Sequence, residues 1–351
     1  MPRCSLTISV PKYLDFFRNL REKVGPSVSV MAVVKANAYG LGALPLALEA
    51  QKSGLVDWFG VASVEEGDEL WQGGIYLPLF LFSQPLGKDI LYALESDLSI
   101  TVYSEKVIRE MAQVAAELGV VGKCHLKINT GMNRLGCEPQ EAKGLAELIL
   151  SFPSLKLEGV MTHFHSSDEP HKASTRAQYA CFEKTVSKLN LPEGVLLHAD
   201  NSAGCKNFPD TYMNMVRIGM DSYSDCVTLA SRVQAVKWVE PGQTISYGAT
   251  YEVKKRTQIA TVDMGYADGV PRCFKGGVMI AGRRHPVVGH VCMDMLMVDV
   301  GEDPVFSGDE VVFVGIQGNV AISLAEFAGF SQRIPYESLC ALGTRVQRLY
   351  C

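Results

Sequence analysis

Lys35 occupies the position in this sequence that is best suited to covalent chemistry. It directly follows the apolar run at residues 28–34 and precedes the segment Ala-Asn-Ala-Tyr-Gly. A lysine held at the end of a buried strand is partly desolvated, and desolvation lowers the pKa of its amine toward neutrality. Such an amine can form a Schiff base with an aldehyde cofactor or act as a base. A solvated lysine at a strand end is the alternative interpretation.

A second cluster, His163 and His165 followed by Asp168 and His171, invites a metal interpretation. Alternate residues of a strand share one face, so both strand histidines could be ligands of one ion. In the alternative interpretation the later residues belong to a loop, and the cluster holds no metal. We expect no metal here, because the first histidine has another expected role, given below.

The elements that position these residues follow a regular rhythm from residue 28 to residue 218. Short apolar runs alternate with helical segments, of which residues 107–118 and 176–189 are the clearest. The candidate strands are residues 28–34, 58–62, 77–82, 98–102, 123–128, 155–162, 195–198 and 214–218. Near-continuously apolar strands that alternate with helices indicate a parallel sheet covered by helices. Eight such units in about 200 residues are typical of a TIM barrel, although a doubly wound open sheet gives a similar pattern.

After residue 223 the pattern changes to short strands joined by turns. The candidate strands are residues 232–239, 258–263, 278–280, 286–291, 295–300 and 310–314, with one helix at residues 323–328. Pairs such as Pro-Gly and Gly-Gly separate them, as expected of a small β domain. We therefore predict an α/β fold with a TIM-like (β/α)8 barrel over residues 1–225 and a mainly-β domain over residues 226–351.

Composition and charge limit the classes of partner. The chain has 351 residues, 20% of them charged, and a formal net charge of -5. Because no basic tract appears, we expect neither nucleic acid nor a membrane as partner. The N-terminal segment has no apolar stretch like that of a signal peptide. The ten cysteines contain no C-x-x-C pair, so we expect reduced thiols in the cytoplasm.

Several motifs resemble those of the alanine racemase family. The similarity begins with Ala-Val-Val-Lys-Ala-Asn-Ala-Tyr-Gly at residues 32–40. It continues in family order at residues 129–136, 161–164, 200–203, 216–219, 245–251, 265–269 and 289–294. Each motif alone is weak, but together they span nearly the whole chain. The family has a TIM-like barrel followed by a β domain, and its first strand joins the second domain, so residues 5–10 are expected to pack there.

The resemblance implies that Lys35 carries pyridoxal 5'-phosphate (PLP) and acts as the base on one face of the substrate Cα. PLP provides the electron sink, and the protein provides orientation and protons. The base on the opposite face is Tyr266 of the partner subunit, in a homodimer whose active sites are completed across the interface. A tyrosine with a pKa of about 10 is a weak base at neutral pH, so positive neighbours must lower it. By its spacing alone, Gly-Tyr-Ala-Asp-Gly rather indicates a turn with a packing tyrosine.

The family pattern also assigns the contacts of the cofactor. Arg217 faces the pyridine nitrogen and keeps it unprotonated, because a guanidinium donates but cannot accept a hydrogen bond. A surface arginine paired with Asp221 is the alternative. TIM-barrel phosphate sites often follow the last two strands, and the resemblance agrees. The further cofactor contacts that it implies are Tyr39, His163, Asn201, Ser202, Gly219 and Met220. The pair at 201–202 is equally consistent with a simple helix N-cap.

The substrate carboxylate is expected to bind Arg134, a planar charged fork suited to carboxylates. Lys127 matches a lysine that many family members carry as a carbamate, and an unmodified lysine is the alternative. Further substrate contacts implied by the family pattern are Cys292, Met293 and Asp294 from the partner subunit. We also expect His163 and Arg217 to be the positive neighbours that lower the pKa of the catalytic tyrosine.

One position departs from the family pattern. Thr344 stands where strict alanine racemases carry a tyrosine that contacts the phosphate and crowds the substrate side chain. The expected activity is therefore interconversion of L- and D-alanine, supplying a D-amino acid for peptidoglycan, with a serine or mixed serine/alanine racemase as the alternative. A non-catalytic PLP-binding protein of the single-barrel type lacks a second domain. A fold-type III decarboxylase and a barrel isomerase without PLP are further alternatives.

Overall fold

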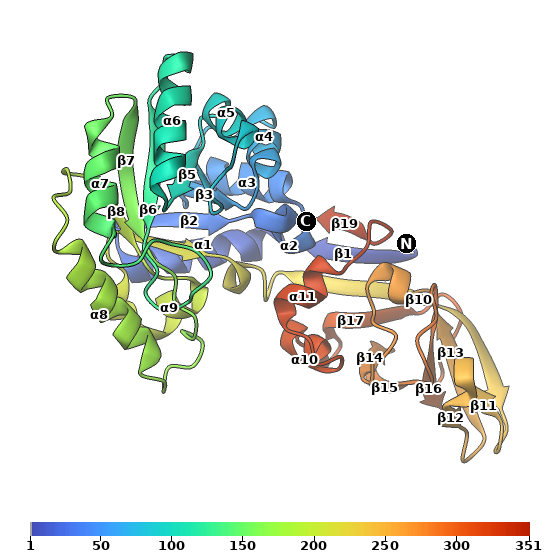
Figure 1. Cartoon of the computed structure of the whole chain (residues 1–351). Coiled ribbons are helices and arrows are strands. Elements are labelled where there is room, and N and C mark those ends of the chain that lie inside the picture. Colours follow the sequence, from blue (N-terminus) through green and yellow to red (C-terminus); the bar gives the residue numbers. More distant parts are fainter. Residues whose placement is uncertain (1) are drawn as a thin grey trace. The chain divides into compact units, whose positions relative to one another are not determined.

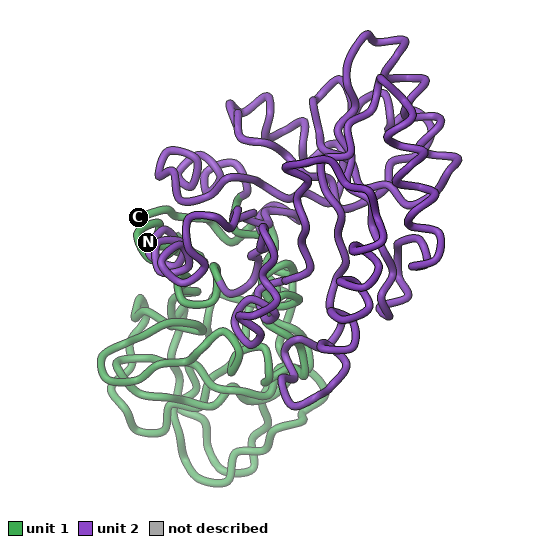
Figure 2. Tube along the Cα trace, turned by 90° about the vertical axis from the view of Figure 1, so that its left-hand side faces the viewer, with its two compact units in different colours: residues 1–13, 39–42, 222–351 green, residues 14–38, 43–221 purple. Residues whose placement is uncertain are grey.

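The computed structural model describes residues 2–351 and divides into two compact units. Unit 1 comprises residues 1–13, 39–42 and 222–351, and unit 2 comprises residues 14–38 and 43–221 (Figure 2). Residue 1, which the predicted N-terminal domain includes, lies outside the described residues. No helix within residues 2–351 is both long and apolar enough to span a bilayer.

Unit 2 is built on eight parallel strands, and helices lie outside them (Figure 1). The strands are β2 (Ser29–Val33), β3 (Trp58–Val61), β4 (Leu79–Leu81), β5 (Ser99–Val102), β6 (Gly122–Lys127), β7 (Leu155–Met161), β8 (Leu196–His198) and β9 (Met215–Ile218). Their order in the sheet is β8-β7-β6-β5-β4-β3-β2-β9. β3 and β5 are buried throughout, as expected for strands covered on both faces.

The sheet of unit 2 is nearly closed into a barrel. β8 and β9 stand at its two ends, and two backbone bonds join them across the seam. Asn214 N donates to Leu197 O at 3.3 Å, and Arg217 N donates to Asp200 O at 3.1 Å. The predicted TIM-like barrel is therefore confirmed, and the open-sheet alternative is wrong.

Helices lie between these strands in the first part of the chain, and local signals mark some of their ends. They are α1 (Val10–Val24), α2 (Lys35–Gly40), α3 (Ala43–Ser53), α4 (Val64–Gln72), α5 (Lys88–Glu95), α6 (Glu105–Leu118), α7 (Ala142–Ser151), α8 (Ser174–Val186) and α9 (Ser202–Asn207). α4 begins after Ser63, whose side chain accepts a hydrogen bond from Glu66 N. α6 ends at Gly119, which adopts a left-handed conformation.

Unit 1 is a mainly antiparallel nine-stranded sheet with two short helices. Its larger strands are β1 (Cys4–Ile8), β10 (Val227–Val239), β13 (Thr257–Val262), β14 (Gly277–Ile280), β15 (Arg283–Val288), β16 (Leu296–Gly301), β17 (Glu310–Gln317), β18 (Val320–Ile322) and β19 (Gln347–Tyr350). The helices are α10 (Leu324–Gly329) and α11 (Pro335–Cys340). β1 pairs antiparallel with β10 and parallel with β19. Buried residues alternate along β16, as expected when one face covers a core.

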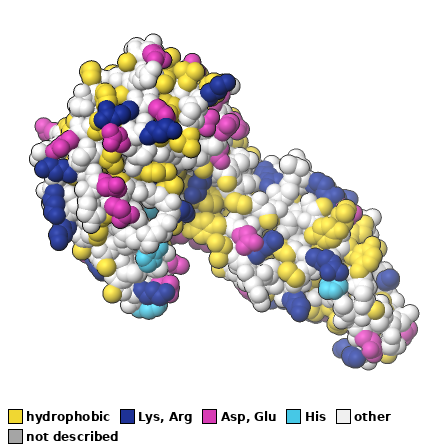
Figure 3. All heavy atoms as spheres, in the orientation of Figure 1, with side chains coloured by type: hydrophobic (Ala, Val, Ile, Leu, Met, Phe, Trp, Pro, Cys, Tyr) yellow, Lys and Arg dark blue, Asp and Glu magenta, His cyan; other side chains and the backbone are white. Residues whose placement is uncertain are grey.

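Charges of both signs are mixed on one face of the molecule. On the face drawn in Figure 3, lysine and arginine side chains are interspersed with aspartate and glutamate. This pattern agrees with the small net charge of -5.

Candidate active site

The lysine at the end of β2 opens a left-handed turn. Lys35 is the first residue of α2, and the next four residues, Ala36 to Tyr39, have φ angles between 50° and 55°. This conformation costs roughly 1–2 kcal/mol per residue for an L-amino acid. Such strain persists only where the surrounding structure enforces it, and it is concentrated at functional sites.

Two side chains hold the strained turn in place. Ala36 N donates to Glu66 Oε1 at 2.7 Å, and Ala43 N donates to Asn37 Oδ1 at 2.7 Å. The other carboxylate oxygen of Glu66 accepts from Ala62 N at 2.7 Å, so this residue links the ends of two neighbouring strands. Sequence reasoning did not identify Glu66.

The amine of Lys35 lies against an aromatic wall. Its Nζ is 5.6 Å from the centre of the Phe82 ring, which directly follows β4. A ring face attracts a cation and also excludes water from one side of it. The lysine is therefore partly shielded from solvent, and this environment differs from that of a freely solvated strand end.

Arg217 lies inside the barrel and is 1% exposed, so the alternative of a surface arginine is wrong. Its Nη1 is 2.9 Å from His198 Nδ1, and its Nη2 is 3.2 Å from His163 Nδ1. Nη2 also donates to Thr162 O at 3.0 Å and to Ala199 O at 2.8 Å. Burial lowers the pKa of Arg217 to about 10, which still leaves the guanidinium charged at neutral pH.

Several basic side chains influence one another at this end of the barrel. Lys127, the last residue of β6, is 5% exposed. Burial, followed by the charges of Arg134, Arg217 and Lys35, lowers the pKa of Lys127 to about 8. Burial and the charges of Arg217, Lys127, Arg134 and Lys35 hold the pKa of His163 well below its usual range. This imidazole is therefore neutral, contrary to the expectation that it is a positive neighbour of the catalytic tyrosine. Such a concentration of positive charge favours anionic ligands.

The residues expected near a phosphate gather after β8 and β9. Gly219 N donates to Ser202 Oγ at 2.9 Å, and Met220 is buried. Asn201 is the N-cap of α9, and its side chain accepts from Gly204 N at 2.9 Å. The helix-cap interpretation of this asparagine is therefore correct, and its side-chain oxygen already accepts a hydrogen bond from the helix.

Tyr39 belongs to unit 1, although it ends the turn that Lys35 begins. Its ring lies 5.3 Å from that of Tyr223 and 5.6 Å from that of Tyr336, measured between centroids. Burial raises the pKa of Tyr39, so its hydroxyl stays protonated.

The other site residues of unit 1 meet at a short turn. Tyr266 N donates to Cys292 O at 3.0 Å, and Ala267 N donates to Met293 O at 3.0 Å. The side chains of Tyr266 and Met293 are 43% and 52% exposed. Two segments that lie apart in the sequence thus present a tyrosine and a methionine together at the surface of the single chain.

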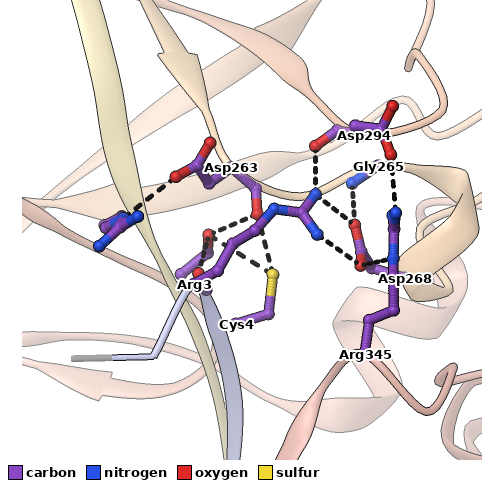
Figure 4. Close-up of polar contacts among 9 residues, drawn as sticks. Arg3, Cys4, Asp263, Gly265, Asp268, Asp294 and Arg345 are labelled. Atoms are coloured by element: carbon purple, nitrogen blue, oxygen red, sulfur yellow. Dashed lines mark hydrogen bonds and ion pairs between the residues drawn. The ribbon is translucent and has the colours of Figure 1, made fainter.

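Asp268 anchors this turn (Figure 4). It is fully buried and accepts from Gly265 N at 2.9 Å, from both Nη atoms of Arg3 at 3.2 and 3.0 Å, and from Arg345 Nε at 3.0 Å. Arg345 also donates to Asp294 Oδ1 at 2.7 Å. Thr344, the residue before Arg345, is exposed. Sequence reasoning missed this network, because hydrogen-bonded partners within it are separated by up to 291 positions.

The predicted site residues are divided between the two units. Lys35, Lys127, Arg134, His163, Asn201, Ser202, Arg217, Gly219 and Met220 belong to unit 2. Tyr39, Tyr266, Cys292, Met293, Asp294 and Thr344 belong to unit 1. In unit 2, His125 also lies in the barrel interior. The two-residue spacing of His125 and Lys127 could have predicted this position, because alternate residues of a strand share a face.

Comparison with known proteins identifies the family. The model of the alanine racemase N-terminal domain matches residues 14–226, and that of the C-terminal domain matches residues 226–350. The chain belongs to the alanine racemase family. The resemblance inferred from the motifs is therefore confirmed. The alanine racemase of Symbiobacterium thermophilum is 38% identical, over 94% of this chain and 92% of that protein.

Two solved structures of the alanine racemase family carry ligands. The enzyme from Bacillus anthracis, described with bound L-Ala-P, has a TM-score of 0.92 and 31% identity, covering 100% of this chain and 95% of that one. The enzyme from Bartonella henselae, described with covalently bound pyridoxal phosphate, has a TM-score of 0.91 and 26% identity, covering 100% of each chain.

The close approach at Gly265 gives a test of the tyrosine turn. A Cβ at this position would lie 2.3 Å from Met293 O and 2.4 Å from Cys292 O. We expect Gly265→Ala to push the two segments apart and to lower the free energy of unfolding by about 1–3 kcal/mol. Urea denaturation measures this change.

Gly329→Ala is the matched control, because a Cβ there meets no atom within 4 Å. It lies in α10, where alanine is favoured over glycine. Equal stability of Gly265→Ala and the wild type would show that the turn and the 292–294 segment are not tightly apposed.

Proposed function

We propose that this protein is a PLP-dependent racemase that interconverts L- and D-alanine. The observation that carries the proposal is the group of basic residues at one end of the barrel, where burial and then the charges of Arg134, Arg217 and Lys35 lower the pKa of Lys127 to about 8. An anionic cofactor and a substrate carboxylate both suit such a site. Membership of the alanine racemase family agrees with this chemistry.

The residues present fit PLP. Lys35 would hold it through its amine, and Arg217 would face the ring nitrogen. Ser202, Gly219, Met220 and Tyr39 would surround the phosphate, with His163 and Asn201 nearby. When bound, PLP supplies an electron sink for the negative charge that develops at the substrate Cα. Because the guanidinium of Arg217 only donates hydrogen bonds, it favours a ring nitrogen that carries no proton.

Racemisation needs a proton donor and acceptor on each face of Cα. The amine of Lys35 acts on one face, and Tyr266 of the partner subunit acts on the other. The exposure of Tyr266 and Met293 in the single chain supports a homodimer that covers them. Cys292 and Asp294 would accompany Tyr266 and Met293 in what the partner subunit contributes to the site.

Arg134 binds the substrate carboxylate. A carbamate on Lys127 would supply a negative charge that orients Arg134.

The relatives named above are alanine racemases, so the serine alternative drawn from Thr344 is not favoured. The D-alanine formed is expected to enter peptidoglycan. The cysteine pattern of the sequence favours a cytoplasmic location.

Reduction of the cofactor linkage tests the assignment of Lys35. After incubation with PLP and borohydride, we expect the adduct on the peptide that contains Lys35, identified by mass spectrometry. Lys35→Ala should lose the adduct and the visible absorption, whereas Lys156→Ala, which changes an exposed lysine elsewhere on the barrel, should keep both. An adduct on another lysine would overturn the assignment.

Tyr266→Phe tests the second base. Removing the phenol should slow proton abstraction from L-alanine by about 10²–10⁴-fold, the usual contribution of a positioned base. The absorption spectrum of bound PLP should not change, because Lys35 is intact. Tyr76→Phe, which alters an exposed tyrosine of unit 2, is the control. Unchanged turnover of L-alanine in Tyr266→Phe would contradict the role.

The lowered pKa of Lys127 predicts reaction with carbon dioxide. Near pH 8 about half of these amines are uncharged, and an uncharged amine adds CO2 to form a carbamate and release a proton. With ¹³C-bicarbonate, we expect a carbamate signal in the NMR spectrum that grows as the pH rises through 8. Lys127→Met should remove it and Lys156→Ala should not; a signal that survives Lys127→Met would refute the site.

A further inference from the structure

A chain of buried polar side chains leads from Arg217 into the barrel core. Arg217 Nη1 lies 2.9 Å from His198 Nδ1, and His198 Nε2 lies 2.8 Å from His125 Nδ1. His125 Nε2 faces Glu158, whose Oε2 is 3.7 Å away. Both imidazoles are fully buried. The chain therefore connects a buried cation to a carboxylate through two histidines.

The donors and acceptors from Arg217 to Glu158 all follow one direction. A guanidinium can only donate, so His198 Nδ1 accepts and its proton sits on Nε2. That proton points at His125 Nδ1, which must accept, so the proton of His125 sits on its Nε2 and points toward Glu158. Burial holds the pKa of both imidazoles below the usual range, so each is neutral with one defined tautomer.

The strands are shaped to admit His125. Gly159 lies opposite it on β7, and a Cβ on this glycine would stand 2.3 Å from His125 Nδ1. The pairing of β6 with β7 also shifts here, from Cys124 opposite Leu157 to His125 opposite Gly159. Glu158 is thus an extra residue on β7. Such a bulge re-aims a side chain.

Glu158 is held as an anion at the end of the chain. Ser99 Oγ donates to its Oε2 at 2.5 Å, and Lys156 Nζ lies 3.3 Å from its Oε1. Burial alone would raise the pKa of Glu158, but the nearby His125 ring and the hydrogen bond from Ser99 outweigh burial and lower the pKa to about 2. A full negative charge therefore accepts at neutral pH.

The surroundings of the two histidines are apolar. The Phe80 ring lies 4.7 Å from that of His125 and 5.7 Å from that of His198, and Trp58 lies 5.7 Å from His125, measured between ring centroids. Within residues 2–351, His125 Nε2 makes no hydrogen bond, and the carboxylate oxygen of Glu158, 3.7 Å away, is the acceptor that its proton faces. In such surroundings a polar network is costly when incomplete.

We propose that His125 and Glu158 are positioning residues for Arg217, because the carboxylate stabilises the same two imidazole tautomers that the guanidinium requires and so helps to keep a lone pair of His198 directed at the guanidinium. The importance of Arg217 for catalysis rests on the proposed function, but the tautomers do not. Without Glu158, His125 can reverse its proton, and His198 can then turn an N–H toward a cation that cannot accept it.

Nitrogen NMR of the histidine rings tests the chain in the full-length protein without cofactor. In the wild type, we expect His198 and His125 to be neutral and protonated on Nε2. Glu158→Ala should give mixed tautomers at both residues. Glu158→Gln should restore them, since its amide oxygen still accepts. Lys156→Ala, which removes only the exposed cation beside Glu158, should leave both spectra unchanged.

Gly159→Ala provides a second route to the same effect, because the added methyl displaces the His125 ring while Glu158 stays. It should disturb the His198 tautomer as Glu158→Ala does, which keeps the test valid if one variant does not fold. Wild-type tautomers in a folded Glu158→Ala or Gly159→Ala protein would overturn the proposal.

Kinetic measurements with PLP and alanine test whether Glu158 affects catalysis. We expect Glu158→Ala to lower kcat about 10- to 100-fold with little change in KM, the size of one lost hydrogen bond to a charged group, and Glu158→Gln to recover most of it. If the wild type is inactive but shows the expected tautomers, the racemase function is rejected, whereas the series of buried polar contacts from Arg217 to Glu158 stands. Normal kcat in Glu158→Ala with disturbed tautomers would overturn the positioning role.

Discussion

The structure depends on positive charge concentrated in a nearly closed parallel barrel. Burial and the charges of Arg134, Arg217 and Lys35 lower the pKa of Lys127, and burial and the charges of all four residues lower the pKa of His163. The buried carboxyl of Asp200 gives only partial compensation, because burial raises its pKa to about 7. Bound anions are thus the natural source of the missing negative charge. A phosphate and an amino-acid carboxylate are both anions of this kind.

Rigid scaffolding and local strain act together around this charge. The barrel strands fix Lys127 and Arg217, whereas a left-handed turn directs Lys35 and is tied by Glu66 to the end of the next strand. In unit 1, Asp268 performs the corresponding task for Tyr266 by joining backbone and arginine donors. In each unit a carboxylate that takes no part in the proposed reaction positions a residue that does.

The sequence predicted the eight barrel strands to within about two residues, because strands buried on both faces read as continuous apolar runs. It did not predict α11 or the left-handed turn, since Ala-Asn-Ala-Tyr carries no signal for such a backbone. The bulge at Glu158 also lacked a local signal, because it depends on β6. Roles within the site came from the family resemblance, whereas long-range partners such as Arg3 for Asp268 required the structure.

Solvent isotope incorporation tests the central claim most directly. The purified protein, supplied with PLP, is incubated with L-alanine in D2O, and the enantiomers and their Cα deuterium content are followed by chiral chromatography and NMR. The account predicts that D-alanine accumulates toward equal amounts of both enantiomers and that this product carries deuterium at Cα. If PLP is bound but neither D-alanine nor deuterated alanine forms, the assignment of this barrel as a racemase active site is contradicted.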